Sequence, residues 1–363
     1  MGESKILVDI IGLDIGGANT KAVFIKTNHE SFHLIEVLVE YFPIWKYPTE
    51  LADTLLKIRE RLNSANIEGV GVTMTAELSD AYQTKEEGVR KILACVAKVF
   101  ADTTVLVLDV DATLRSLTEA LSEPLKVASA NWAATGWMVS QLVENCVIID
   151  VGSTSTSIIP IVAGRIAVCG KTDLEKLING ELVYTGALRT NVAAIVSTVP
   201  LNGGCARVSS ELFAQSGDVH LFLGNIGEGE YTGETADGRG KTRVEAVARL
   251  SRVVCADANM LCEGEILDIA KYIYDRQVEH VAAGLTQVLT RVKSVSKKDI
   301  VAVVTGVGKD FIARKAAKQA GFREIVDLGE LIQNPLATKA SPALGVALIV
   351  ANKIEGKRIK WTQ

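Results

Sequence analysis

The sequence predicts an α/β protein made of two copies of one domain, each with a mixed sheet and flanking helices, and a cleft between the copies. Apolar runs of strand length alternate with segments of helical period along most of the 363 residues, which is the pattern of sheets covered by helices. A strand, an Asp-x-Gly turn and a second strand also occur twice, with Asp14 and Asp150 136 residues apart. A repeat at domain spacing predicts a duplicated fold.

The first predicted domain covers residues 1–145. Apolar runs at residues 6–13, 21–25 and 32–39, separated by turn signals, predict an antiparallel three-strand meander. Further periodicity predicts, in order, a helix at 50–62, a strand at 67–72, a helix at 87–100, a strand at 104–110 and a helix at 128–143.

The second predicted domain covers residues 146–335. It opens with two strands and a turn across residues 147–162 and a third strand at 165–168, and then has a long irregular section at 172–240 with a glycine-rich insertion near 200–240. Periodicity then predicts helices at 242–254 and 265–292, a strand at 300–304 and a helix at 309–320. The last segment, 336–363, holds a helix at 340–352 that is expected to pack back on the first domain.

Composition excludes several classes of protein. A chain that is 48% hydrophobic and 23% charged is globular, and a net charge of −4 argues against non-specific nucleic-acid binding. No apolar run reaches the roughly 18 residues of a membrane helix, and the N-terminus does not have the form of a signal peptide. The six cysteines form no Cys-x-x-Cys pair, so we expect no disulfide framework and no zinc site. Taken together, these observations predict a cytoplasmic protein with no nucleic-acid partner and no membrane partner. A homo-oligomer stays open.

Three glycine elements predict a phosphate site. After each repeated aspartate, glycines let backbone N–H groups approach an anion, while the carboxylates of Asp14 and Asp150 can hold a divalent metal, expected to be Mg²⁺. A third element at a strand-to-helix junction offers a helix N-terminus. The alternative is that each is an ordinary tight turn. The predicted phosphate-binding residues are Gly16, Gly17, Asn19, Thr20, Lys21, Gly152, Ser153, Thr154, Gly306 and Gly308.

This combination resembles the actin-like ATPase superfamily, whose domains have a ribonuclease H-like fold. In that superfamily two Asp-x-Gly hairpins bind phosphate and a later Gly-x-Gly binds adenosine; Asp14, Asp150 and the pair Gly306 and Gly308 match these positions. The resemblance covers most of the chain and implies duplicated actin-like domains, but it does not specify a reaction.

Other segments give a narrower resemblance, within the hydantoinase/oxoprolinase-like branch. Together with Asp14 and Asp150, they resemble the archaeal methanofuran-biosynthesis enzymes called MfnF and their relatives in tetrahydromethanopterin-linked C1 metabolism. The segments are 72–80 (VTMTAELSD), 128–135 (ASANWAAT), 201–205 (LNGGC) and 229–241 (GEYTGETADGRGK). The resemblance implies a transferase that couples [5-(aminomethyl)furan-3-yl]methyl diphosphate to γ-glutamyltyramine, or to a related phenol, releasing diphosphate and needing no ATP.

Such a reaction suggests roles for particular residues. Lys21 and a metal near the two aspartates would stabilise the departing diphosphate. A base would help to ionise the phenol, and Asp150 and Glu77 are candidates for it. Trp132 and Asn131 are candidates for substrate binding, although a large aromatic residue at the position of Trp132 is more often part of the core. Asp109 and Asp111, at a strand end, would pair with the aminomethyl cation; the favoured alternative is that Asp111 caps the next helix. Arg239 and Lys241 have the form of a mobile phosphate lid, with a solvated surface loop as the alternative.

Two other functions fit the same glycine elements. A small-molecule kinase of the superfamily would use these turns with ATP. An ATP-dependent switch or activator protein would use them to drive a partner, although the scattered cysteines offer no evident iron–sulfur ligands.

Overall fold

A computed structural model describes residues 8–28, 31–62, 66–295 and 298–356. The chain divides into two compact units. Unit 1 comprises Met1–Asn145, Ile161–Glu175 and Leu328–Gln363, and unit 2 comprises Cys146–Pro160 and Lys176–Asp327. The sequence placed 161–175 and 328–335 in the second domain instead; residues 161–175 group with unit 1, where β9 (Arg165–Ile166) contacts α4 (Asn131–Ser140).

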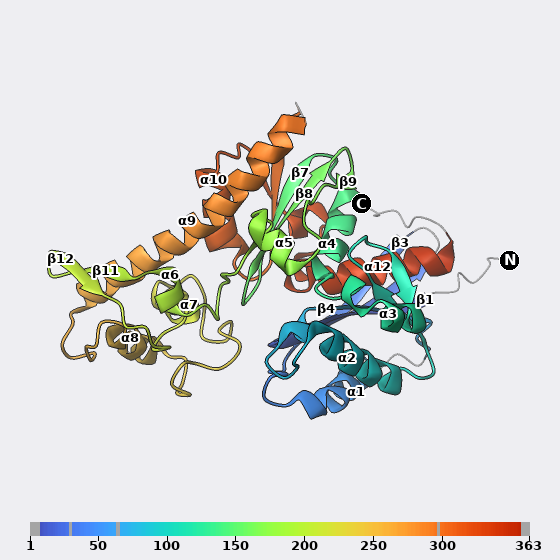
Figure 1. Cartoon of the computed structure of the whole chain (residues 1–363), viewed down its shortest axis with the longest axis horizontal. Helices are drawn as coiled ribbons and strands as arrows, with labels where there is room; N and C mark the ends of the chain where they lie inside the picture. Colours follow the sequence, from blue (N-terminus) through green and yellow to red (C-terminus); the bar gives the residue numbers. More distant parts are fainter. Residues whose placement is uncertain (1–7, 29–30, 63–65, 296–297, 357–363) are drawn as a thin grey trace. The chain divides into compact units, whose positions relative to one another are not determined.

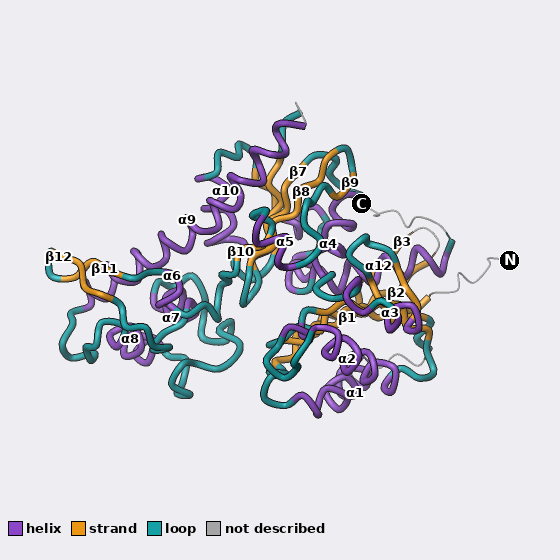
Figure 2. The backbone as a smooth tube through the Cα atoms, in the orientation of Figure 1, coloured by secondary structure: helices purple, strands orange, loops and turns teal. Residues whose placement is uncertain are grey.

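Unit 1 is built on a six-stranded mixed sheet of order β3-β2-β1-β4-β5-β6. Strands β1, β2 and β3 form the predicted antiparallel meander, while β1, β4 and β5 run parallel. Figure 2 shows these strands as one layer with helices around it. The strand bounds are Val8–Ile15 (β1), Asn19–Asn28 (β2), Ser31–Tyr41 (β3), Gly69–Met74 (β4), Thr104–Leu108 (β5) and Leu114–Ser116 (β6). Residues 6 and 7 of the first predicted strand lie outside the described residues.

Helices cover both faces of this sheet (Figure 1). Helices α1 (Leu51–Leu62) and α2 (Lys85–Val99) pack on the face that carries Leu13 and Val72, in a fully apolar core. Helix α12 (Ser341–Glu355) packs on the other face, where Gly12 leaves room: a Cβ on Gly12 would lie 1.9 Å from the carbonyl oxygen of Ala343. The remaining elements are α3 (Leu117–Ser122), α4, β9, α11 (Leu328–Leu331) and 3₁₀ turns at Pro48–Glu50, Ala76–Leu78, Pro124–Lys126 and Pro335–Lys339.

Unit 2 contains the second sheet, of order β10-β8-β7-β13-β14, with β7, β13 and β14 parallel. The 33-residue helix α9 (Glu263–Val295) runs from this sheet into a second apolar cluster formed with α6, α7 and α8. The bounds are Cys146–Val151 (β7), Thr156–Val162 (β8), Leu182–Val183 (β10), Val192–Ile195 (α6), Thr198–Leu201 (β11), Gly204–Arg207 (β12), Ser216–Phe222 (α7), Arg243–Arg252 (α8), Val301–Thr305 (β13), Arg314–Gln319 (α10) and Ile325–Asp327 (β14).

Two sequence-based predictions for this half were wrong. The section 172–240, expected to be irregular, contains α5 (Asp173–Ile178), β10, α6, the β11–β12 hairpin and α7, elements of two to seven residues that are too short to produce a periodic signal. The helix expected at 309–320 begins instead with a π-helical turn at Lys309–Ala313 before α10.

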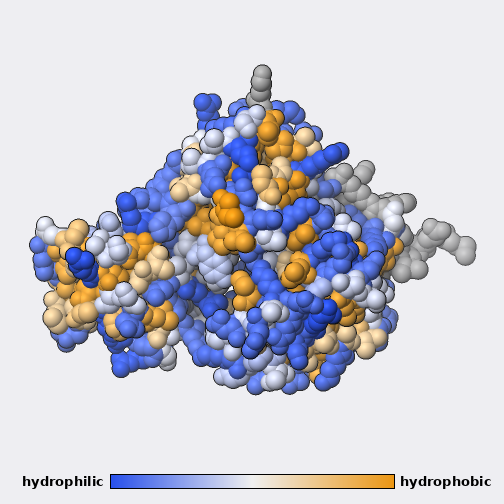
Figure 3. Space-filling view, in the orientation of Figure 1, coloured by the Kyte–Doolittle hydropathy of each residue, from blue (hydrophilic) through white to orange (hydrophobic). Residues whose placement is uncertain are grey.

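The surface of unit 2 carries an apolar area near α5. On the face drawn in Figure 3, apolar side chains gather around α5 and β10, and Leu177, Ile178 and Tyr184 of this region are 47%, 67% and 58% exposed. Exposed apolar areas are typical of contact surfaces, but the predicted homo-oligomer stays a prediction. No helix among the described residues combines the length and apolar character needed to span a bilayer.

Candidate functional site

The first glycine turn, in unit 1, presents backbone N–H groups. The Gly16 N–H donates to the Asn19 carbonyl (3.0 Å), and the carbonyls of Gly17 and Ala18 accept from Ile44 and Phe42. Within the described part of the chain, nothing accepts from the N–H groups of Gly17 and Ala18. Successive unpartnered N–H groups in a tight turn form an anion site, so this turn has the geometry predicted for phosphate binding.

Asp14 lies at the end of β1, beside this turn, and is buried with one oxygen unused. Lys21 is its register partner on β2, with Nζ 3.8 Å from Oδ2, whereas Oδ1 has no hydrogen-bond partner among the described residues. Burial raises the pKa of Asp14, and Lys21 and a hydrogen bond from Asn131 oppose that rise. A buried carboxylate oxygen without a partner is costly, so Asp14 has the form of a residue that completes its coordination with a ligand.

Other buried oxygens lie close to Asp14. Thr73 on β4 is its register partner on the opposite side from Lys21, and its Oγ1 has no partner in the described structure. The same holds for Thr135, one helical turn after Asn131 on α4. Asn19 of the turn also carries a side-chain oxygen without a described partner. So does Thr20, but it pairs with Ile15 and therefore lies on the opposite face of the sheet from Asp14. Polar atoms of this kind normally pair with protein, water or ligand, so the oxygen of Thr73, which lies on the same face as Asp14, supports a polar ligand beside Asp14.

A second cluster in unit 1 surrounds Glu77, which is 1% exposed. The Ser129 hydroxyl lies 2.6 Å from Glu77 Oε1, 2.7 Å from Asp173 Oδ2 and 3.2 Å from Lys85 Nζ. A hydroxyl has one proton and can donate to only one carboxyl group, so the other short O···O contact needs a proton on a carboxyl. Asp173 is paired with Lys85 at 2.5 Å, and burial raises the pKa of Glu77. We therefore assign the proton to Glu77.

The segment 129–131 contributes to both clusters, because Ser129 contacts Glu77 while Asn131 lowers the pKa of Asp14. Trp132 is buried at the start of α4, as its alternative interpretation as a core residue required.

Asp109 is fully buried too: Oδ1 accepts the N–H groups of Asp111 and Thr113, and Oδ2 accepts from Arg115 at 2.7 Å. Asp109 therefore stabilises its own turn, and the structure offers no oxygen of it to a substrate amine.

The second glycine turn, in unit 2, repeats the first. The Gly152 N–H donates to the Ser155 carbonyl (2.9 Å), while the carbonyls of Gly152 and Ser153 accept from Ala187, Leu188 and Arg189. For the N–H groups of Ser153, Thr154 and Ser155 the described chain provides no acceptor. Both turns thus direct backbone donors away from the protein that supports them.

The third glycine element lies directly against the second turn. A Cβ on Gly306, whose φ is +86°, would lie 2.4 Å from the Val151 carbonyl oxygen and 2.6 Å from Asp150 Oδ1. The Gly308 N–H donates to the Val151 carbonyl at 3.0 Å. Glycine is required here by both backbone conformation and close approach. The structure therefore brings the second and third predicted elements together in unit 2.

Arg189 is a cation beside the second turn that the sequence did not indicate. Its Nη1 donates to Thr154 Oγ1 at 3.2 Å, and its backbone N–H donates to the Ser153 carbonyl. No local spacing could have identified it, because it lies 35 residues from Thr154. It supplies unit 2 with a positive charge comparable to that of Lys21 in unit 1.

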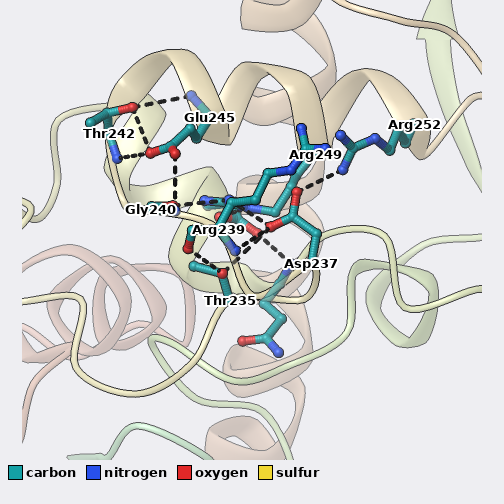
Figure 4. A network of polar contacts seen from close by, with 10 residues as sticks. Thr235, Asp237, Arg239, Gly240, Thr242, Glu245, Arg249 and Arg252 are labelled. Atoms are coloured by element: carbon teal, nitrogen blue, oxygen red, sulfur yellow. Dashed lines mark hydrogen bonds and ion pairs between the residues drawn. The ribbon is translucent and has the colours of Figure 1, made fainter.

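The predicted lid around Arg239 and Lys241 is held in a fixed network, shown in Figure 4. The fully buried guanidinium of Arg249 on α8 contacts Asp218 at 2.8 Å, Asp237 at 3.1 Å and the Gly240 carbonyl at 3.1 Å. Arg252 also pairs with Asp237 at 2.8 Å. Burial raises the pKa of Asp237, but its hydrogen bonds and ion pairs with Arg252 and Arg249 outweigh burial and lower the pKa to about 2.

Within this network Lys241 lies over the Tyr231 ring, whereas the side chain of Arg239 is exposed. Because Arg249 and Arg252 anchor the segment to α8, it has the form of an anchored loop and lacks the free hinge that a lid needs. The charges at its surface stay available to a ligand.

A metal site built from several ligands is not apparent. Within the residues that the structure describes, no three His, Cys, Asp or Glu side chains form a group able to hold a metal ion. Asp14 lies in unit 1 and Asp150 in unit 2, so a metal shared by the two aspartates stays a prediction.

Comparison with known proteins identifies the class. The hydantoinase/oxoprolinase family model matches residues 68–351. Among solved structures, nucleotide-free acetone carboxylase has a similar fold, with a TM-score of 0.54 at 11% identity over 94% of this chain and 70% of that one. The predicted duplicated actin-like α/β fold is confirmed.

Two curated relatives define the family more narrowly. A (4-{4-[2-(γ-L-glutamylamino)ethyl]phenoxymethyl}furan-2-yl)methanamine synthase from Methanocaldococcus jannaschii is 38% identical over 304 residues, covering 84% of this chain and 87% of the relative. The synthase of the same name from Methanococcus vannielii is 34% identical over 224 residues, covering 60% of this chain and 97% of the relative. The chain belongs to this synthase family, as the MfnF resemblance predicted.

Proposed function

We propose that this chain is the aryl-ether-forming transferase of methanofuran biosynthesis. It joins [5-(aminomethyl)furan-3-yl]methyl diphosphate to the phenol of γ-glutamyltyramine and releases diphosphate. The observation that carries the proposal is the 38% identity to a synthase over 84% of the chain. The name of that synthase describes a furan methanamine bearing a phenoxymethyl group, which contains one aryl ether bond.

The proposed reaction breaks one C–O bond and forms another. The bond between the furanmethyl carbon and diphosphate breaks with its electron pair on the diphosphate, and the phenol oxygen bonds to the carbon as its proton passes to a base. Charge therefore develops on the leaving group, and preorganised donors at that group are the expected source of catalysis. Each glycine turn supplies such donors through its unpartnered N–H groups, together with Lys21 in unit 1 and with Arg189 in unit 2.

The residues also suggest where a divalent cation would help. We propose Mg²⁺ as cofactor, with Asp14 holding it in unit 1, because Asp14 Oδ1 is buried without a described partner. A bound cation would neutralise charge on the diphosphate. Asp150 is the second proposed ligand, in unit 2. ATP is not part of this proposal.

Of the two candidate bases, we propose Asp150. Two short contacts of the Ser129 hydroxyl, with Glu77 and with Asp173, support a proton on Glu77, and a protonated carboxyl cannot accept the phenol proton. Asp150 is only partly buried and adjoins the second turn and Gly306. We also propose that Asn131, which lowers the pKa of Asp14, contributes to substrate binding.

A product assay tests the function. The protein is incubated with the furanmethyl diphosphate, γ-glutamyltyramine and Mg²⁺ without ATP, and the products are measured by mass spectrometry. We expect the coupled ether and diphosphate in equal amounts. Product formation only when ATP is added, or a phosphorylated substrate in place of the ether, would return the chain to the kinase class.

A further inference from the structure

A fully buried polar network lies behind the second glycine turn in unit 2. Gln277 on α9 and His220 on α7 are 1% and 0% exposed. Gln277 Oε1 lies 2.9 Å from His220 Nε2, and His220 Nδ1 lies 3.1 Å from Asn225 Nδ2. Since an amide oxygen only accepts, His220 carries its proton on Nε2, and Nδ1 accepts from Asn225. The network therefore fixes one tautomer and one orientation of the Gln277 amide.

The other end of Gln277 holds the peptide of Gly186. Gln277 Nε2 donates to Thr185 Oγ1 at 2.9 Å and to the Gly186 carbonyl at 2.8 Å. Ser216 Oγ donates to the same carbonyl at 2.9 Å, and the Gly186 N–H donates to Thr190 Oγ1 at 2.9 Å. Both polar groups of Gly186 are thus held by buried side chains, which leaves this peptide little freedom to move.

Gly186 in turn lies flat against the second turn. A Cβ at this position would be 2.6 Å from the backbone N and C of Thr154 and 2.7 Å from the Gly152 carbonyl oxygen. The next residue, Ala187, donates its N–H to the Gly152 carbonyl at 2.9 Å, and Thr156 Oγ1 donates to the Thr185 carbonyl at 2.8 Å. A displacement of Gly186 would therefore displace the turn that presents the N–H groups of Ser153 and Thr154.

The same network touches the segment that follows the third glycine element. The His220 ring packs on the Phe311 ring with centroids 4.5 Å apart, and Tyr274 donates its hydroxyl proton to the Phe311 carbonyl at 2.5 Å. Phe311 lies three residues after Gly308. One buried cluster thus supports both glycine elements of unit 2.

We propose that Gln277 and His220 are positioning residues for the diphosphate, and that they act by holding Gly186 against the second turn. Neither residue touches the ligand. They fix the direction of the turn N–H groups in advance, so that these donors need no rearrangement when the leaving group becomes charged. That the ligand is diphosphate rests on the proposed function, whereas the support of the second turn by Gln277 and His220 does not.

The test compares Gln277→Met with Gln287→Met. Gln277→Met keeps the side-chain volume close to that of the wild type while removing the donors to Thr185 and Gly186. Gln287→Met is the matched control, because Gln287 lies on the same helix and donates to the Ile178 carbonyl, away from the turn. Amide hydrogen exchange of Gly152 and of residues 185–190, whose N–H groups are hydrogen-bonded, is measured together with the Michaelis constants of both substrates. Ser216→Ala, which removes one donor to Gly186, is the second variant in case Gln277→Met does not fold.

We expect the amides of Gly152 and of residues 185–190 to exchange at least tenfold faster in Gln277→Met. The KM for the diphosphate substrate should rise at least tenfold, with the KM for the phenol within twofold of the wild type. Ser216→Ala should show the same pattern with smaller changes, and Gln287→Met neither. Unchanged exchange in these segments overturns the positioning role, as does an equal rise of both KM values. If the wild type forms no ether, the proposed function fails, and the exchange rates still decide whether Gln277 supports the turn.

Discussion

Lowering the pH should destabilise unit 2 through His220. Its burial, opposed only by the hydrogen bond with Gln277, lowers the pKa from 6.5 to about 4 in the folded protein. The unfolded chain therefore takes up a proton at a pH where the folded protein resists it. The stabilising contribution of the neutral imidazole is complete above pH 6.5 and is lost as the pH falls from 6.5 to 4.

The size of this effect follows from the two pKa values. A separation of about 2.5 pKa units corresponds to roughly 3 kcal/mol when the transition is complete, and to roughly 2 kcal/mol at pH 5. Protonation also opposes the native hydrogen bonds directly, since Nδ1 of the imidazolium would face Asn225 as a donor. A loss of this size is a substantial part of the 5–15 kcal/mol that is typical of domains.

The assay has to report on unit 2 alone. All four tryptophans (Trp45, Trp132, Trp137 and Trp361) lie outside the residues of unit 2, so tryptophan fluorescence would follow the other unit. Amide exchange of α7 and α9 in increasing urea, at pH 7.5, 6 and 5, measures the opening of unit 2 directly.

The decisive comparison is between wild type and His220→Gln, with His280→Gln as the control because His280 is an exposed residue of α9. Buried carboxyls with raised pKa values, such as Asp218, contribute with the opposite sign and are common to all three proteins. His220→Gln should be less stable at pH 7.5 but lose about 2 kcal/mol less than the wild type on going to pH 5. Equal losses in wild type and His220→Gln would refute the assignment of the pH dependence to His220.

Three further changes give separate expectations. Glu77→Gln should keep the fold and most of the activity, because a glutamine amide can either accept from or donate to the Ser129 hydroxyl, which contacts Glu77 Oε1; a loss of turnover beyond tenfold, measured with the product assay, would show that Glu77 takes part as a carboxylate. Gly12→Ala should cost about 3 kcal/mol or more, since its Cβ would meet the Ala343 carbonyl oxygen at 1.9 Å. Urea unfolding followed by tryptophan fluorescence measures this loss, and a shift below about 0.5 kcal/mol would contradict the packing argument. Arg249→Met should leave Asp218 buried without its partner and lower stability by about 3–5 kcal/mol, with faster amide exchange at 235–245; unchanged exchange there would mean that Arg249 does not anchor the loop.

The sequence alone was sufficient to locate the features that depend on backbone conformation. The Asp-x-Gly turns at Asp14 and Asp150 could be located because a tight turn that exposes N–H groups needs glycine at fixed positions, and because each turn interrupts two apolar strands. The meander and the long helices were found for a related reason, since each extends over enough residues for a periodic pattern to appear.

The rest of the site depends on contacts between residues far apart in the sequence. Gln277 lies 92 residues from Thr185 and 57 from His220, so no local pattern marks any of them. The charges of Arg239 and Lys241 suggested a mobile lid, because no local pattern indicates that Arg249 is buried against Asp218 and Asp237. A glycine in a sequence can indicate a loop or a place where two backbone segments approach closely. Only the packing of α12 shows that Gly12 is needed for such a close approach.

The two turns show what the internal repeat preserves. In unit 1 the carbonyls of Gly17 and Ala18 accept N–H groups from the residues that follow β3, and in unit 2 the carbonyls of Gly152 and Ser153 accept N–H groups from residues 187–189. The supporting segments have no sequence in common, yet each ties down the acceptor side of its turn and leaves the donor side unpaired.

Each turn also has a cation beside it, Lys21 in unit 1 and Arg189 in unit 2. Lys21 is positioned by the register of β2 against β1, and Arg189 belongs to the segment that supports the second turn. The repeat therefore conserves a backbone arrangement, in which carbonyls are satisfied internally so that N–H groups face outward, more closely than it conserves side chains. An anion such as diphosphate is recognised mainly by N–H groups and positive charge, so a duplicated backbone can supply two matching sites even where the side chains have diverged.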